Sequence, residues 1–187
     1  MLSLNASAPP PLRWKDPLEP SFRHIFKYSG TQIVEVLVER LGPGSGTDNS
    51  VHTFSYDSRG FIKTKKMEYL RSGGIKELFT IDRLITDDGG NVTKIEKDYY
   101  YNGTLASTAV ELREYDNKTN PFYKLISPTN IDEYFNPNNR TKNTVIDRYG
   151  ILYPSFYEYE YNADGWPVKL TSTLETGTFV ALWDYYK

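Results

Sequence analysis

Residues 157–167 read YEYEYNADGWP, and this stretch contains the pattern that predicts the fold of much of the chain. Tyrosine and glutamate alternate through residue 161, as in a strand that carries rings on one face and charges on the other. The residues that follow favour a tight turn, because the Asn162 side chain can accept backbone hydrogen bonds and Gly165 tolerates a left-handed backbone. The stretch therefore predicts one strand and the turn of an antiparallel β-hairpin.

The same turn recurs elsewhere in the chain. Residues 56–61 (YDSRGF) match residues 161–166 (YNADGW) in the spacing of aromatic, Asx, glycine and aromatic positions. Residues 87–90 (DDGG) fit the same frame, and Lys94 follows Gly90 at the spacing that separates Lys169 from Gly165. A two-residue turn at Asn102-Gly103 and a weaker one at residues 28–30 add further hairpins. This repetition indicates an internally duplicated hairpin unit.

The expected fold is all-β. Alternation through residues 33–39, 92–98 and 179–186 predicts further strands, giving eight to ten antiparallel strands joined by short turns. The simplest arrangement is a meander of hairpins curled into a half-barrel or barrel-like sheet. The composition agrees, because 16 tyrosines, 9 phenylalanines and 3 tryptophans suit a pleated, half-buried surface. The sequence predicts one β domain over residues 21–187.

Two segments depart from this rhythm. Residues 1–20 contain five prolines and predict a linker or tether, or alternatively a start left after an export signal was removed. Residues 116–154 are rich in asparagine and proline and predict a long loop with one short helix over residues 129–135. A loop of this length is either a functional site or a plug over an open end of the sheet. The plug would use Phe122, Tyr123, Leu125, Ile126, Tyr134 and Phe135.

Composition excludes several classes of protein. The chain has 22 basic and 24 acidic side chains, so its charge of −2 gives no support for a nucleic-acid partner. It has no cysteine, which excludes disulfides and thiolate metal sites. We expect no transmembrane span, because no apolar run reaches 18 residues and charges alternate through residues 92–98. We expect no cofactor.

The sequence predicts no catalytic or metal site. His24 and His52 lie in different segments, and no nucleophile elbow or zinc-binding motif is present. Residues 87–91 (DDGGN) lack the spacing of a calcium loop and match the hairpin turns instead. A glycoside hydrolase stays open as a less favoured alternative, since two carboxyl groups about 5–10 Å apart suffice for that reaction. The carboxylates on neighbouring hairpins are Asp82, Asp87, Asp88, Glu96, Asp98, Glu111 and Glu114.

Aromatic residues on alternating strands are the candidate ligand-binding groups. Rings held on a rigid sheet can stack on the faces of sugars or contact hydrophobic ligands. The competing interpretation is that these rings build the core of a chain with few other large apolar residues. The candidates are Tyr99, Tyr100, Tyr101, Tyr157, Tyr159, Tyr161 and Trp166.

Several of these motifs together resemble a known family. The Tyr-Asx-x-x-Gly-aromatic turns, the Asn120-Pro121-Phe122 triplet, the Asn138-Asn139 pair and residues 157–167 are similar to a family of uncharacterised secreted Bacteroidetes lipoproteins. That family is a domain of unknown function with a porin-like β fold, and the hairpins also resemble the tyrosine-aspartate repeats of large bacterial surface proteins. The resemblance covers residues 22–187 and carries over no catalytic residue.

The resemblance implies export to the periplasm or the outer-membrane surface of a Gram-negative bacterium. This chain has no lipid-bearing cysteine, so a lipid tether would have to lie upstream of it. We therefore predict a non-catalytic binding module for a glycan or lipid. The alternative is a structural or protein-docking domain of a surface lipoprotein, with an envelope protein as its partner. A binding module predicts aromatic rings beside a cavity, whereas a docking domain predicts a flat edge strand that is open to pairing.

Overall fold

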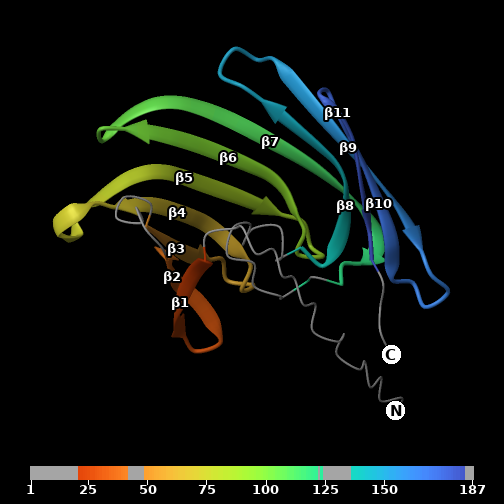
Figure 1. The fold of residues 1–187 in the computed structure, drawn as a ribbon, viewed down its shortest axis with the longest axis horizontal. Coiled ribbons are helices and arrows are strands. Elements are labelled where there is room, and N and C mark those ends of the chain that lie inside the picture. Colours follow the sequence, from red (N-terminus) through yellow and green to blue (C-terminus); the bar gives the residue numbers. More distant parts are fainter. Residues whose placement is uncertain (1–20, 42–48, 122, 124–135, 184–187) are drawn as a thin grey trace.

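The computed structural model describes residues 21–41, 49–121, 123 and 136–183. Within these residues, eleven strands form one antiparallel sheet in which every strand pairs with its neighbours in the sequence, and Figure 1 shows this sheet curving into an open trough. Strands β1 and β11 are its two edges and are not paired with each other. The predicted all-β meander is confirmed, as a curled open sheet and not a closed barrel. The strands are β1 (Ser21–Ser29), β2 (Gln32–Leu41), β3 (Ser50–Tyr56), β4 (Ile62–Leu70), β5 (Lys76–Thr86), β6 (Val92–Tyr101), β7 (Thr104–Thr119), β8 (Asn138–Ile146), β9 (Leu152–Tyr161), β10 (Pro167–Leu174) and β11 (Gly177–Leu182).

The prediction of eight to ten strands and of one loop over residues 116–154 was wrong. Strand β7 continues to Thr119, β8 runs from Asn138 to Ile146, and β9 begins at Leu152. The first half of β8 is polar and lacks the apolar alternation that marks an ordinary strand. Its asparagines are held instead by hydrogen bonds to neighbouring segments, which hydropathy does not reveal.

Other predictions fall partly or wholly outside the described residues. These are the linker over residues 1–20, the helix over residues 129–135 and every plug residue except Tyr123. The predicted last strand, residues 179–186, corresponds to β11, which ends at Leu182. A short 3-10 turn, η2 (Ser72–Gly74), connects β4 to β5.

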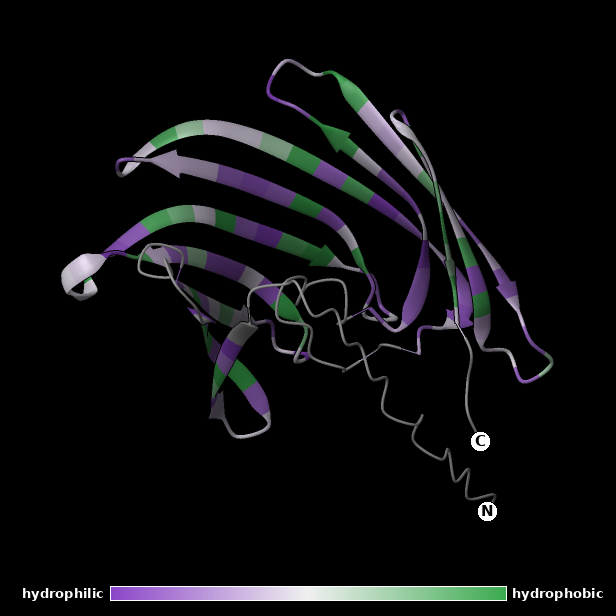
Figure 2. Cartoon of the chain, viewed as in Figure 1, coloured by the Kyte–Doolittle hydropathy of each residue, from purple (hydrophilic) through white to green (hydrophobic). Residues whose placement is uncertain are grey.

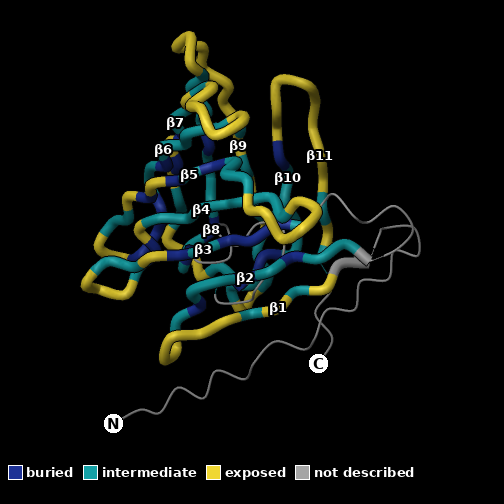
Figure 3. The backbone as a smooth tube through the Cα atoms, turned by 90° about the vertical axis from the view of Figure 1, so that its left-hand side faces the viewer, coloured by how far each residue is buried: buried dark blue, intermediate teal, exposed yellow. Residues whose placement is uncertain are grey.

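One face of the sheet carries the core, and we call it the inner face. Register places Val36, His52 and Met67 opposite one another, and likewise Leu84 and Ile95, so these side chains share that face. Hydrophobic and polar residues alternate along the strands in Figure 2, and Figure 3 shows the buried positions within the strands. In a single-layer sheet the concave side is the one that curvature can shield from water. The buried apolar cluster consists of Ile33, Val36, Val38, Phe54, Ile62, Leu84, Val92 and Ile95.

A row of charged side chains crosses the same inner face. Lys65, Asp82 and Lys97 lie directly opposite one another on β4, β5 and β6. Lys65 Nζ lies 3.8 Å from Asp82 Oδ2, and Lys97 Nζ lies 2.9 Å from Glu111 Oε2 on β7. Glu111 Oε1 also accepts a 3.0 Å hydrogen bond from Arg113 Nη2. Opposite charges therefore alternate across four strands, which offsets the cost of burying each one.

The repeated turns have the predicted geometry. In the β3–β4 turn, Asp57 N donates to Phe61 O and Gly60 N donates to Asp57 O, at 2.8 and 3.0 Å. The Asp57 carboxylate caps the turn by accepting from Arg59 N and Phe61 N, both at 2.9 Å. The β5–β6 and β9–β10 turns, at Asp87 and Asn162, repeat this pattern.

A fourth copy of this turn, at residues 147–151, was missed in the sequence. Asp147 Oδ1 accepts from Tyr149 N and Ile151 N at 2.8 and 2.9 Å, and Gly150 N donates to Asp147 O. The motif differs from the others by having an aliphatic residue after its glycine, and it lay inside the segment assigned to a loop. The four copies join β3 to β4, β5 to β6, β8 to β9 and β9 to β10.

Two of the turn glycines differ in the space around them, and this gives a testable contrast. Gly90 and Gly165 have φ of +93° and +82°, but a Cβ on Gly90 would meet the Phe61 ring at 2.7 Å while one on Gly165 would meet nothing within 4 Å. We expect Gly165→Ala to cost about 1–2 kcal/mol of unfolding free energy from backbone strain alone. Gly90→Ala should cost at least about 1 kcal/mol more, because Phe61 must move. Urea unfolding of both variants measures the difference, and equal losses would contradict the close approach.

Candidate functional site

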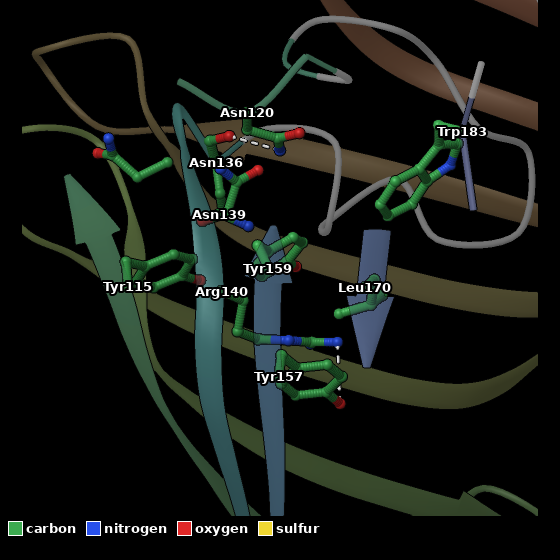
Figure 4. A pocket seen from close by; sticks show the side chains of 10 residues that line it. Tyr115, Asn120, Asn136, Asn139, Arg140, Tyr157, Tyr159, Leu170 and Trp183 are labelled. Atoms are coloured by element: carbon green, nitrogen blue, oxygen red, sulfur yellow. Dashed lines mark hydrogen bonds between the residues drawn. The ribbon is translucent and has the colours of Figure 1, made fainter. Parts of the chain in front are cut away.

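A cavity of ≈ 250 Å³ lies on the inner face where β7, β8, β9 and β10 meet the segments next to them (Figure 4). Aromatic rings and amides dominate its lining, with one cation and one aliphatic residue. The lining residues are Tyr115, Asn120, Asn136, Asn138, Asn139, Arg140, Tyr157, Tyr159, Leu170 and Trp183.

The asparagines form the framework of this cavity. Asn136 is 3% exposed, and its Oδ1 accepts a 2.6 Å hydrogen bond from Val92 N at the start of β6. Asn120 Nδ2 donates to Asn136 O at 2.9 Å, as the dashed line in Figure 4 marks. Asn138 exchanges two hydrogen bonds of 3.0 and 3.1 Å with Asn91. These bonds fix the beginning of β8 against β6, which holds the cavity wall rigid.

A second group of polar contacts extends this framework from Asn139 to β9 and β7. Asn139 is 4% exposed and donates through Nδ2 to the Tyr161 hydroxyl at 3.0 Å. The Tyr161 hydroxyl in turn donates to Asp116. The Tyr159 and Tyr161 rings stack with centroids 6.1 Å apart. Tyr159 is thus oriented by a neighbour whose own position is fixed by hydrogen bonds.

Arg140 is the only charged side chain among the described residues that line the cavity. Its guanidinium lies over the Tyr157 ring, 4.6 Å from the centroid, and its Nη2 donates to the Tyr157 hydroxyl at 3.2 Å. The cation–π contact adds to the hydrogen bond in fixing both groups. The Tyr157 hydroxyl accepts from Arg140, and a hydroxyl that accepts can still donate its own proton.

The structure distributes the seven candidate ligand-binding residues over different places. Tyr157 and Tyr159 line the cavity, and Tyr161 supports it through Asn139. Trp166 lies in the β9–β10 turn, where its backbone nitrogen donates to Asn162. Tyr99, Tyr100 and Tyr101 lie at the far end of β6, beside the β6–β7 turn, and the Tyr99 ring contacts Phe79.

Sequence reasoning missed most of the cavity lining. Asn120 and Asn139 were seen only as loop composition and as part of the family resemblance, Asn136 only as loop composition, and Arg140 and Trp183 were not singled out. Runs of asparagine carry no periodic signal, so only the pairing of β8 with β7 reveals that they converge. The clue that the sequence did offer was the density of amide side chains near the tyrosine-rich strand, since amides in a strand need fixed partners.

Six of the seven carboxylates behind the hydrolase alternative form ion pairs or cap a turn, and Asp88 is fully exposed beside Arg59. Asp82 and Glu111 belong to the buried charged row, and Asp87 caps a turn. Asp98, Glu96 and Glu114 pair with Arg83, Lys94 and Lys142, at 2.8, 2.7 and 2.8 Å respectively. His52 is buried and its ring bonds to the Ser50 hydroxyl.

Among the described residues, no group of three or more His, Cys, Asp or Glu side chains is arranged to hold a metal ion. None of the described segments forms a helix with the length and apolar character needed to cross a membrane.

Because of two tyrosines in and beside the cavity, Tyr115 and Tyr161, we expect the protein to lose stability at alkaline pH. Burial raises the pKa of Tyr115 to about 12, and burial together with Asp116 raises the pKa of Tyr161 above its ordinary value. An unfolded tyrosine loses its proton near pH 10, so from there upward the unfolded state releases protons that the folded state retains. The free energy of unfolding should therefore fall between about pH 10 and pH 12.

Tyr115→Phe tests this prediction. The variant should be less stable at neutral pH, because it loses the 2.8 Å hydrogen bond to Val92 O. Between pH 10 and 12 its free energy of unfolding should fall less than that of the unmodified protein. The difference should reach up to about 2.7 kcal/mol for a shift of two pKa units. Urea unfolding across that range measures the slope, with Tyr101→Phe as the control because Tyr101 is 71% exposed. A Tyr115→Phe slope equal to that of the unmodified protein would contradict the assignment.

Fold and cavity together define an open, curved antiparallel sheet with an amide and aromatic pocket at one end. No family model matches the chain, and no curated protein matches it significantly. A porin-like protein from Bacteroides vulgatus is similar in structure, with 12% identity and a TM-score of 0.54 over 87% of this chain and 85% of that one.

Two further solved structures are more distant. A porin-like protein from Bacteroides uniformis has 10% identity and a TM-score of 0.42 over 86% of this chain and 74% of that one. A protein of unknown function from Bacteroides fragilis has 10% identity and a TM-score of 0.29 over 89% and 91%. The likeness to the Bacteroides vulgatus protein confirms the expected porin-like β fold. Membership of a lipoprotein family stays a prediction.

Proposed function

We propose that this chain is a non-catalytic binding module of the bacterial envelope whose cavity holds one sugar unit of a glycan. The observation that carries the proposal is the lining of the cavity, which combines aromatic rings with amide, hydroxyl and guanidinium groups. A sugar ring presents apolar C–H faces and a rim of hydroxyls, so it needs both kinds of group at once. A purely apolar ligand would leave the polar groups unsatisfied.

The geometry of the cavity supports this match. Tyr157, Tyr159 and Trp183 approach from β9 and from the end of β11, so rings can contact a bound sugar from more than one strand (Figure 4). The volume of ≈ 250 Å³ is slightly below the range of about 300–1,000 Å³ for drug-sized ligands, as expected for a single ring. The hydrogen-bonded asparagines keep the site formed before binding, which reduces the entropy lost on association.

The chemistry of the lining favours binding over hydrolysis. Glycoside hydrolysis requires two carboxyl groups at the scissile bond, and no aspartate or glutamate is among the described residues that line the cavity. The envelope location rests on the resemblance in the turns and asparagine motifs, and the fold shared with the Bacteroides vulgatus protein agrees with it.

A glycan-array screen of the full chain, followed by calorimetric titration of the best glycan, tests the proposal. Tyr159→Ala should weaken binding about tenfold, because it removes one stacking ring. Tyr101→Ala is the matched control, since this tyrosine is 71% exposed at the opposite end of the sheet. The proposal would be overturned if both substitutions weakened glycan affinity equally, or if the array gave no hit.

A protein-docking role is the second candidate, and one observation favours it. Among the described strands β11 pairs only with β10, and it carries Phe179, Val180 and Leu182, which are 61%, 49% and 74% exposed. No charged residue lies within β11, although charges are a common protection of edge strands. If the glycan screen gives no hit, capture of envelope proteins by the full chain, compared with a Val180→Lys variant, becomes the informative experiment.

A further inference from the structure

A second cavity, of ≈ 430 Å³, lies among the turn ends of β1 to β6. Its lining differs from that of the first cavity, because it combines aromatic and aliphatic side chains with three uncharged polar ones. The lining residues are Tyr28, Thr31, Gln32, Ile33, Tyr56, Gly60, Phe61, Ile62, Thr86, Gly90, Val92 and Tyr123. We propose that this second cavity binds an aliphatic chain, such as the alkyl or acyl portion of an amphiphile.

The floor of the second cavity is the hydrophobic core itself. Ile33, Ile62 and Val92 are 7%, 5% and 2% exposed and belong to the buried apolar cluster. The Tyr56 hydroxyl donates its proton to Ile33 O at 2.6 Å, so it has no proton to donate to a ligand. The Tyr56 ring therefore contributes an apolar wall. A ligand in this cavity therefore meets carbon surface on its deepest side, where each buried methylene is favourable.

The side chains that form the walls and the rim of the second cavity are also uncharged. Phe61 is held between Gly90, which has no side chain to displace it, and the Arg59 guanidinium, whose carbon lies 4.9 Å from the ring centroid. Tyr28 is 53% exposed and Thr31 is exposed, which places both at the opening. No charged side chain is among the described lining residues, so the buried part of the ligand is uncharged.

The second cavity is separate from the proposed glycan site but shares a wall with it. Tyr115 lines the first cavity and Val92 lines the second, and the Tyr115 hydroxyl donates to Val92 O at 2.8 Å. Aliphatic binding can therefore be measured without any sugar. Its failure and the failure of the glycan proposal are distinguishable.

Fluorescence of N-phenyl-1-naphthylamine, an uncharged apolar dye, provides the test on the full chain. The dye should brighten on binding, and straight-chain alcohols of six to twelve carbons should displace it. The displacing affinity should rise about fourfold per methylene until the cavity is filled. Displacement that does not depend on chain length, or dye fluorescence that is unchanged by the protein, would overturn the inference.

Two pairs of variants locate the binding. Thr31→Trp should close the opening and reduce dye affinity at least tenfold, whereas Thr104→Trp, at the opposite end of the sheet, should not. Tyr28→Ala should weaken binding by removing an exposed wall ring, whereas Tyr101→Ala should leave it unchanged. All four positions are exposed, so the variants should fold, and circular dichroism checks this. Equal dye affinities within both pairs would place the dye elsewhere and overturn the proposal.

Discussion

Glu111→Gln should lower the free energy of unfolding by about 3–5 kcal/mol, which is a large part of the total for a small domain. Glu111 is 7% exposed and is the shared partner of Lys97 and Arg113, at 2.9 and 3.0 Å. Neutralising it leaves two cations on the inner face without their common counter-charge. Removing one member of a buried ionic group is costly because the others remain desolvated.

Glu114→Gln is the matched control for this prediction. Glu114 lies three residues further along the same strand and pairs with Lys142, but its side chain is 66% exposed. Its loss should cost no more than about 1 kcal/mol. Urea unfolding of both variants at neutral pH gives the comparison. Similar losses for the two would mean that the charged row is solvated and does not stabilise the inner face.

The same cluster predicts a response to acid. Burial alone would raise the pKa of Glu111, but Arg113 and Lys97 outweigh it and hold the pKa below its ordinary value. The unfolded state therefore takes up a proton at higher pH than the folded state does. The stabilisation from Glu111 is present above the unfolded pKa and is lost as the pH falls through the folded one, so Glu111→Gln should flatten this part of the acid profile.

Ile95→Ala should cost about 2–5 kcal/mol of unfolding free energy. Ile95 is 0% exposed at the centre of the inner face, between Leu84 on β5 and Glu111 on β7. Truncation leaves a void that the surrounding strands can fill only in part. Ile85→Ala removes the same atoms from a side chain that is 49% exposed, and should cost less than about 1 kcal/mol. Equal costs would contradict the assignment of the core to the inner face.

The sequence was most informative where a local rule decides the structure. Turn chemistry at Asp57, Asp87 and Asn162 is encoded within six residues, and period-two alternation assigns Tyr157 and Tyr159 to one strand face. Strand β8 was not predicted because the hydrogen-bond partners of Asn138 and Asn139 include Asn91 and Asp116, which are distant in the sequence. The same reason hid the cavity, since its lining converges only when β7 to β10 are side by side.

The burial of the charged row is a second feature that the alternation of residues in the sequence does not predict. From the sequence alone, Asp82 and Glu111 are expected on a solvated face, because acidic residues on a β surface usually are. The curvature of the sheet places them inside instead, each opposite or beside a cation. Alternation predicts which residues share a face, but it cannot show which face the sheet will enclose.

The indole N–H signals of the tryptophans in a ¹⁵N-labelled sample test the glycan site most directly. Trp183 lines the cavity, whereas Trp166 lies in the β9–β10 turn outside it, and substitution of each by phenylalanine assigns the signals. Titration with the best glycan from the array should shift the Trp183 indole signal in proportion to occupancy and leave the Trp166 signal in place. A glycan that saturates the protein without moving the Trp183 signal would contradict the proposed site.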